Sequence, residues 1–308
     1  MKGRVLICIL VHQKSLDLKN FQKIKLDKKD QLLIIFDKIN FKFNKKKFEN
    51  IKVIKGNKKN NSVPYYRNLA IKYAKEKFKY ILFIDSDTIP SKNIVNKHYK
   101  AHEKFKFIPL IGGSVKPSYT VKFKSIWEFF DGILSWFTSI EPKNDRIILK
   151  PYHLPTCNLS IKLNHLKKYK IYFDEKLKTG EDVDLCNKFR SYNLDLLLIK
   201  NASIIHQDRK GFIQFLNHQL EWGKHHYYLR YKKLLFENNK FTLTLFFLFF
   251  YPLIFLFLSL IMTYFTIVPW IKKNFLFSFN FVPIYLIYFI KSLSTYSEFF
   301  KDLTKIKN

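Results

Sequence analysis

Several acidic side chains in this sequence lie where carboxylates can do chemistry. The apolar run Tyr80–Ile84 predicts a buried strand, and Asp85, Ser86 and Asp87 follow it directly. Open α/β sheets bind ligands at the carboxyl edge of their strands. Once a turn brings Asp85 and Asp87 together, their mutual repulsion favours the capture of a hard divalent cation that also holds a diphosphate. A polar turn that simply ends the strand is the alternative interpretation.

A second acidic group follows later in the chain. Glu181, Asp182 and Asp184 come directly after Gly180. The dipole of a helix favours negative charge at its start, so N-terminal capping alone accounts for these acids. The functional interpretation makes one of the carboxylates a general base. His206 ends a later apolar stretch, and a lone histidine in that position is more often structural than a ligand.

The elements that must position these groups alternate along the chain. Short apolar runs predict strands, and apolar residues at helical spacing predict helices between them. Such interleaving favours an α/β domain with a largely parallel sheet. The sequence contains neither a Gly-rich dinucleotide fingerprint nor a P-loop. The predicted strands are Arg4–Leu10, Gln31–Phe36, Ile51–Ile54, Tyr80–Ile84 and Leu196–Ile199, and the predicted helices are Tyr65–Lys77 and Glu181–Ser191.

The composition bounds the class of protein. The net charge of +31 raises the hypothesis of a nucleic-acid partner. However, lysines far outnumber arginines and are spread along the whole chain, which favours a solvated basic surface, and we expect no nucleic acid. A basic surface also suits anionic lipid headgroups. Cys8, Cys157 and Cys186 match no metal-ligand spacing and are typical of buried thiols in a reducing compartment.

The chain changes character near residue 240. No Asp, Glu, Lys or Arg occurs from Phe241 to Trp270, and about 20 apolar residues suffice to cross a bilayer. After Lys272 and Lys273, a second uncharged run, Phe275–Ile290, either crosses again or lies in the interface. We therefore predict a membrane region and leave one or two crossings open. The first apolar run lacks the features of a secretory signal, so the N-terminal part is expected in the cytosol.

In order and spacing, the motifs resemble those of glycosyltransferase family 2, the large group of inverting, nucleotide-sugar-dependent enzymes with the GT-A fold. The resemblance covers roughly residues 4–225, and the part from Leu154 to His206 is the most specific. The stretches that carry it are Val63–Ala70, Phe83–Asp87, Cys157–Ile161, Phe173–Glu175, Gly180–Leu185 and Ile205–His206.

The resemblance implies a role for individual residues. Asp37 would contact the nucleotide base, and Arg67 and Asn68 match an Arg-Asn pair near the donor. Asp85 would lie near the ribose and the metal. The remaining implied roles are metal ligation by Asp87, completion of the metal and diphosphate site by His206, and general base catalysis by Asp182, with Glu181 as the second candidate.

The family also implies a fold, ligands and a location. We expect a GT-A-like mixed, mostly parallel sheet flanked by helices, followed by a C-terminal transmembrane helical region. The predicted domains are a cytosolic catalytic domain at 1–235, a membrane region at 241–293 and a basic tail at 294–308. The implied ligands are Mn²⁺ or Mg²⁺, a nucleotide-diphosphate sugar (a UDP-sugar above all), a glycan or polyprenyl-linked acceptor, and membrane lipid. The implied location is the cell membrane, with the catalytic domain on the cytoplasmic face.

Two alternatives remain open at this stage. The first is a processive polysaccharide synthase subunit. Such synthases carry Gln, two residues, Arg and Trp in this region, whereas this chain has His218 at the Gln position and Glu221 at the Arg position before Trp222. The second alternative is a non-catalytic membrane-bound module that binds polyanions or glycans. The acids described above argue against it, because such a module has no use for them.

Overall fold

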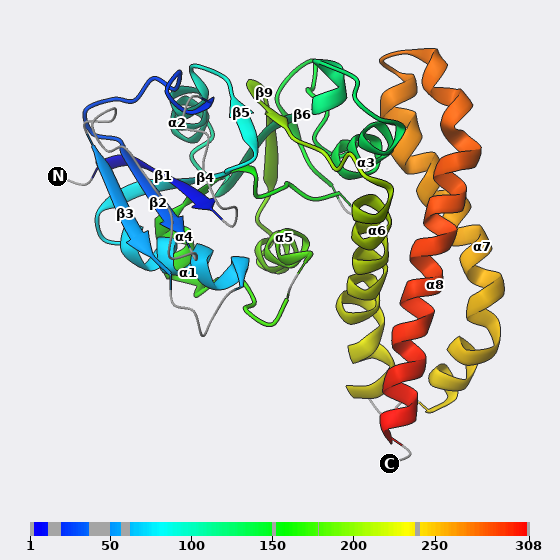
Figure 1. Cartoon of the computed structure of the whole chain (residues 1–308). Coiled ribbons are helices and arrows are strands. Elements are labelled where there is room, and N and C mark those ends of the chain that lie inside the picture. Colours follow the sequence, from blue (N-terminus) through cyan, green and yellow to red (C-terminus); the bar gives the residue numbers. More distant parts are fainter. Residues whose placement is uncertain are drawn as a thin grey trace. The chain divides into compact units, whose positions relative to one another are not determined.

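The computed structural model describes residues 3–11, 20–36, 50–56, 62–149, 152–177, 179–237 and 241–306 (Figure 1). Its contacts divide the chain into two compact units. The sheet unit comprises Met1–Pro117 and Thr138–Gln207, and the helical unit comprises Ser118–Phe137 and Asp208–Asn308. The predicted Asp37 lies outside the described residues.

The sheet unit is built on one mixed nine-stranded sheet in the order β3-β2-β1-β4-β8-β6-β9-β5, with β7 paired to β9. Strands β3, β2, β1 and β4 are parallel neighbours, whereas β8 runs antiparallel to both β4 and β6. The strands are β1 Gly3–Val11, β2 Gln31–Phe36, β3 Ile51–Lys55, β4 Phe78–Asp85, β5 Thr88–Pro90, β6 Leu110–Pro117, β7 Arg146–Ile147, β8 Asn158–Lys162 and β9 Leu196–His206.

The central strands are apolar throughout because both faces of the sheet are covered. In β1, every residue from Val5 to Val11 is buried. Helices α1 (Val63–Ala74), α4 (Leu163–Tyr169) and α5 (Glu181–Ser191) pack on one face, and α2 (Ile94–Lys104) packs on the other (Figure 1). Ser62 caps α1 by accepting a hydrogen bond from the backbone N–H of Tyr65, so the helix begins at Val63, two residues before the predicted start.

Strand β8 carries polar side chains into the sheet, where α2 satisfies them. His98 Nδ1 lies 2.8 Å from Ser160 Oγ, and its Nε2 lies 2.9 Å from Asn158 Oδ1. His102 Nε2 lies 2.8 Å from the same Ser160 oxygen. Burial lowers the pKa of His98 to about 4, although the hydrogen bond to Asn158 acts in the opposite direction. Both imidazoles are therefore neutral parts of the core at neutral pH.

This network predicts that acid destabilises the sheet unit. Unfolding returns His98 to an ordinary pKa of 6.5, so the unfolded chain binds a proton that the folded chain rejects. The contribution is fully present above about pH 6.5 and is lost as the pH falls towards 4, amounting to about 3 kcal/mol. Thermal unfolding in detergent between about pH 7 and about pH 5 measures the loss. His98→Gln should flatten this pH dependence, whereas His165→Gln, at a partly exposed position on α4 where burial also lowers the pKa, should flatten it less. An unchanged slope in His98→Gln would contradict the assignment.

The helical unit gathers segments that are distant in sequence. Trp127 packs its ring on Phe212 and Phe215, and Trp270 Nε1 donates to the backbone oxygen of Ile133 at 3.1 Å. These contacts join α3 to the C-terminal helices. The elements are η3 Ser118–Thr120, α3 Ile126–Trp136, α6 Phe212–His226, the π-helical continuation η4 Tyr227–Glu237, α7 Phe241–Ile271, η5 Phe275–Asn280 and α8 Phe281–Ile306.

Two helices of this unit are long and apolar enough to cross a membrane, over Phe246–Ile271 and Phe275–Thr304. The predicted fold class, a mixed α/β sheet flanked by helices and followed by apolar C-terminal helices, is therefore confirmed.

The limits of the two compact units differ from the predicted domain limits. Residues 118–137 and 208–235 pack with the C-terminal helices rather than with the sheet, and residues 294–306 of the predicted tail continue α8. The assignment of these parts to cytosol and membrane stays a prediction.

Candidate functional site

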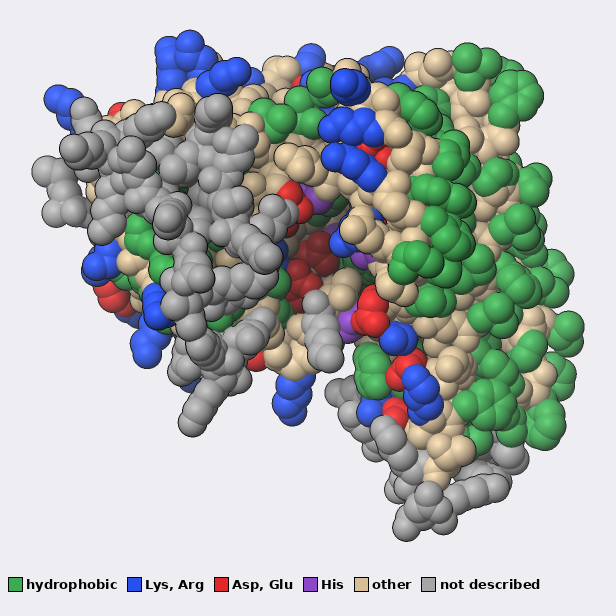
Figure 2. Space-filling view, viewed as in Figure 1, with side chains coloured by type: hydrophobic (Ala, Val, Ile, Leu, Met, Phe, Trp, Pro, Cys, Tyr) green, Lys and Arg blue, Asp and Glu red, His purple; other side chains and the backbone are tan. Residues whose placement is uncertain are grey.

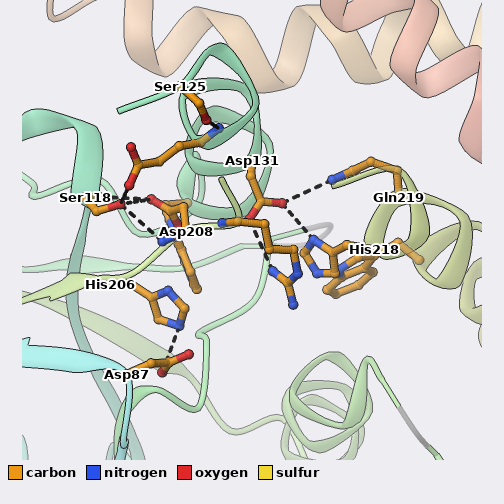
Figure 3. A network of polar contacts seen from close by, with 12 residues as sticks. Asp87, Ser118, Ser125, Asp131, His206, Asp208, His218 and Gln219 are labelled. Atoms are coloured by element: carbon orange, nitrogen blue, oxygen red, sulfur yellow. Dashed lines mark hydrogen bonds and ion pairs between the residues drawn. The ribbon is translucent and has the colours of Figure 1, made fainter. Parts of the chain in front are cut away.

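A group of three side chains in the sheet unit has the composition of a metal site. Asp85 ends β4, and after a tight turn β5 begins at Thr88. Strand β5 pairs antiparallel with the end of β9, which sets Thr88 opposite His206. Asp85, Asp87 and His206 each offer a ligand atom, and these atoms all lie within 4.8 Å of one another. Figure 3 shows Asp87 and His206 pointing toward one another, with His206 Nε2 3.5 Å from Asp87 Oδ1.

The backbone fixes this arrangement. The hydroxyl of Thr88 donates to the carbonyl oxygen of Asp85 at 2.7 Å, and the N–H of Gln207 donates to the carbonyl oxygen of Asp87 at 3.0 Å. Two carboxylates and one imidazole fit a divalent cation. Because Mg²⁺ prefers oxygen ligands and imidazole suits transition metals, this donor set fits Mn²⁺ better than Mg²⁺.

Arg67 links the candidate metal site to the start of α5. Its side chain is 4% exposed, and its Nη1 donates to Glu181 Oε1 while its Nη2 donates to Asp85 Oδ1 at 3.3 Å. Burial alone would lower the pKa of Arg67, but the charges of Glu181 and Asp85 outweigh that effect and raise it. The guanidinium therefore stays charged and ties α1, β4 and α5 together.

Asp182 lies in the first turn of α5, directly after Gly180 and Glu181. Gly180 adopts a left-handed φ of 76°, which glycine tolerates without strain. The backbone N–H of Val183 donates to Asp182 Oδ1 at 2.8 Å, and His153 Nε2 lies 3.5 Å from Oδ2. Burial raises the pKa of Asp182 to about 6, although the charge of Arg67 opposes the shift. A carboxylate with this pKa can accept a proton near neutral pH.

The two acids that compete for the role of base differ in their surroundings. The pKa of Glu181 is also raised, chiefly by burial. However, Arg67 holds one oxygen of Glu181 in an ion pair with a buried guanidinium. Accepting a proton there would weaken that pair, whereas Asp182 has no arginine or lysine ion pair in the described part of the chain.

The pKa of the Cys157 thiol responds to the carboxylates of the candidate site. Burial raises its pKa well above the usual value, and the negative charges of Asp85, Asp87 and Asp182 raise it further. Cys157 immediately precedes β8, so the charges of these three acids act on the start of that strand. The thiol stays protonated, as expected from the sequence for a buried cysteine.

Asn68, which was predicted to lie near the nucleotide-sugar donor, has its side-chain amide hydrogen-bonded to a neighbouring loop. Its amide donates to the carbonyl oxygen of Phe173 at 3.0 Å and to Glu175 Oε1 at 2.9 Å, and it accepts from the N–H of Phe173 at 3.0 Å. In this state Asn68 positions the loop that precedes α5. A direct contact with a nucleotide sugar stays a prediction, as does the base contact of Asp37. His153 was not predicted, because a single histidine in an irregular segment gives no sequence signal.

A second polar cluster, centred on Asp131 of α3, lies in the helical unit (Figure 3). Asp131 is 1% exposed and accepts hydrogen bonds from His218 Nδ1 at 2.8 Å, from the Arg209 backbone at 3.1 Å and from Gln219 Nε2 at 3.3 Å. His218 Nε2 accepts from Trp222 Nε1 at 2.9 Å, which fixes a neutral tautomer with the proton on Nδ1. His218 and Trp222 lie in the region where processive synthases carry their Gln, Arg and Trp. Here they form a hydrogen-bonded chain to the buried carboxylate of Asp131.

No family model matches this chain, and no curated protein matches it. One solved structure that matches is the crystal structure of S. aureus TarS, a glycosyltransferase, at 15% sequence identity and a TM-score of 0.46. The match covers 70% of this chain and 38% of that chain, so this chain spans well under half the length of TarS. A likeness at this level carries no argument about reaction or substrate. Membership of glycosyltransferase family 2 stays a prediction.

Proposed function

We propose that this protein is an inverting, metal-dependent glycosyltransferase that moves a sugar from a nucleotide-diphosphate sugar to an acceptor hydroxyl. The observation that carries the proposal is the convergence of Asp85, Asp87 and His206 in the unit that also contains Asp182, a largely buried carboxylate with a raised pKa. One group suits a cation that binds a diphosphate, and the other suits proton removal. Together they are the two requirements of sugar transfer from such a donor.

Asp182 removes the proton from the acceptor hydroxyl in the proposed reaction. The hydroxyl oxygen forms a bond to the anomeric carbon while the bond from that carbon to the diphosphate oxygen breaks. Attack opposite the leaving group inverts the anomeric configuration. The pKa of about 6 suits this role, because the carboxylate is ionised at neutral pH and still basic enough to hold the proton.

The remaining charged groups hold the site in place. Asp87 and His206 would bind the cation directly, and Asp85, one of whose oxygens faces Arg67, would complete the set. When bound, the cation neutralises the charge that develops on the leaving diphosphate. Arg67 acts as a positioning residue, since it holds Glu181 and with it the first turn of α5.

The substrates are proposed on chemical grounds and on the family resemblance. The donor is a UDP-sugar, and the acceptor is a glycan or a polyprenyl-linked glycan in the synthesis of a cell-surface polysaccharide or glycolipid. The apolar C-terminal helices support attachment to a membrane, where a lipid-linked acceptor is concentrated. The catalytic unit is proposed to face the cytoplasm, where nucleotide sugars are made.

A panel of nucleotide sugars tests the proposal. Donor hydrolysis and transfer to a membrane extract are measured with detergent-solubilised protein and Mn²⁺. Turnover of one donor, abolished by a chelator, is the expected result and names the sugar. No turnover with any donor, by protein whose circular dichroism shows it folded, would contradict the proposal. Steeply salt-dependent DNA binding in the same preparation would favour the polyanion-binding module.

A further inference from the structure

Helix α7 is apolar on the outside and partly polar on the inside. Large apolar side chains face solvent over much of its outer side, and one stripe of them at helical spacing reaches 45–70% exposure. Ser259, Thr263 and Thr266 are buried against the rest of the unit, and Thr266 Oγ1 lies 2.5 Å from the hydroxyl of Tyr288 on α8. Figure 2 shows hydrophobic side chains covering this edge of the helical unit. The stripe consists of Phe249, Leu253, Phe257, Leu260 and Tyr264.

An outer surface of this kind needs an apolar environment. An exposed apolar patch as long as a helix marks a site of contact with lipid or another protein. The continuation of the patch favours lipid. Phe275, Leu276 and Phe279 of η5 are 62–76% exposed and follow the exposed pair Lys272 and Lys273 directly. Exposed aromatic and aliphatic side chains beside lysines are typical of helices that lie in the interface of anionic membranes.

Helix α6 shows how α7 and α8 can meet that membrane. It runs along α8 in close contact: Ser294 Oγ donates to the carbonyl oxygen of Leu220 at 2.8 Å, and Thr295 Oγ1 donates to that of Gly223 at 2.8 Å. A Cβ atom on Gly223 would lie 2.1 Å from the backbone oxygen of Lys291. The pairing continues into η4, where Tyr228 donates to Glu298 at 3.2 Å. Figure 1 shows α6, α7 and α8 side by side.

The side chains of α6 and η4 are incompatible with surrounding hydrocarbon. Glu221 and Lys224 have 45% and 37% of their side chains exposed, and Arg230 is exposed as well. If α7 and α8 crossed a bilayer along its normal, α6 and η4 would be carried to the same depth. These ionisable groups would then face lipid, where charged side chains are expensive and rarely found. A crossing therefore conflicts with the packing of the unit.

We infer that α7, α8 and η5 attach the protein to one leaflet of an anionic bilayer. The helices lie in the plane of the membrane, and neither of them crosses it. The stripe on α7 enters the lipid, and α6, on the other side of α8, stays in water. This mode of attachment rests on the proposed membrane association and is independent of sugar transfer.

Single cysteines at the two ends of the helix pair distinguish the alternatives. Asn274→Cys lies at the turn after α7, Lys301→Cys lies in the second half of α8, and Lys79→Cys reports the sheet unit; all three positions are exposed. The native cysteines are buried, so they give little background with a membrane-impermeant maleimide. In spheroplasts and in inverted vesicles, we expect Asn274→Cys, Lys301→Cys and Lys79→Cys to label from the same side. Labelling of Asn274→Cys and Lys301→Cys from opposite sides would show a crossing and overturn the inference.

Flotation with lipid vesicles tests the surface itself. Phe257→Asp should lower binding to vesicles of phosphatidylcholine and phosphatidylglycerol by about tenfold or more, because a carboxylate replaces a side chain in lipid. Phe107→Asp, at a position of the sheet unit that is 89% exposed, should bind like the wild type. Replacing Lys272 and Lys273 by Gln should lower binding by about fivefold per lysine, and only with the anionic lipid. Equal binding by Phe257→Asp and wild type would overturn the proposal. So would a wild-type protein that forms a dimer and does not bind vesicles.

Discussion

Replacing Asp182 by Asn is expected to lower the rate of sugar transfer by about a thousandfold while the protein stays folded. The amide keeps the shape of the side chain and can still accept from the N–H of Val183, but it cannot take the proton of the acceptor hydroxyl. In the wild type, kcat/KM should rise with pH and reach half its plateau near pH 6, because the base must be ionised and the pKa of Asp182 is about 6. Initial rates across that range, with the donor found active, measure both effects.

Asp184→Asn is the matched control for this prediction. Asp184 lies two residues further along α5 and pairs with Lys188 at 2.7 Å, one helical turn away. A partly exposed pair one helical turn apart contributes little, so the rate should change by less than about twofold. Glu181→Gln tests the second candidate for the base, since it removes the charge of one of the two carboxylate partners of Arg67. We expect it to loosen the site, while kcat/KM still rises with a single ionisation, that of Asp182. A profile that follows Glu181→Gln while Asp182→Asn retains activity would transfer the role of base to Glu181.

Removing either Asp87 or His206 is expected to weaken Mn²⁺ binding by more than about tenfold. Both side chains contribute a ligand atom to the cluster, whereas Asp85 shares one oxygen with Arg67. Asp87→Asn and His206→Ala should therefore lose Mn²⁺ first, and transfer should require correspondingly more metal. The loss of the electron paramagnetic resonance signal of free Mn²⁺ measures binding without any substrate.

Asp195→Asn, an exposed carboxylate in the turn before β9, controls for general loss of negative charge and should bind Mn²⁺ as the wild type does. Donor turnover at full rate in the presence of a chelator would contradict the proposed metal dependence. It would leave the proposal of sugar transfer intact.

The local elements of the sheet unit were predictable because their sequence patterns are strong. The boundaries of β2 and α5 agree with the prediction, Gln31–Phe36 and Glu181–Ser191. A wholly apolar run between polar residues predicts a buried strand, and acids at the start of an apolar helical period predict a helix start. Strand β8 was not predicted, because Asn158 at its start and Ser160 in its middle resemble a loop. In the folded protein both are hydrogen-bonded inside the core, to His98 of α2 and to backbone oxygens of neighbouring strands.

The residue pattern along the chain predicts the fold class, the apolar C-terminal helices and the residue types of the candidate site. Which of these residues meet depends on how distant segments pair in the folded protein. His206 reaches Asp87 because three residues of β5 pair with the end of β9, and a strand that short has no periodic pattern to predict it. In the same way, the charge-free run of α7 predicted a membrane segment, whereas the polar helix packed alongside decides how that segment can meet lipid. Local patterns report burial, but pairing between distant segments depends on the free energy of the whole fold.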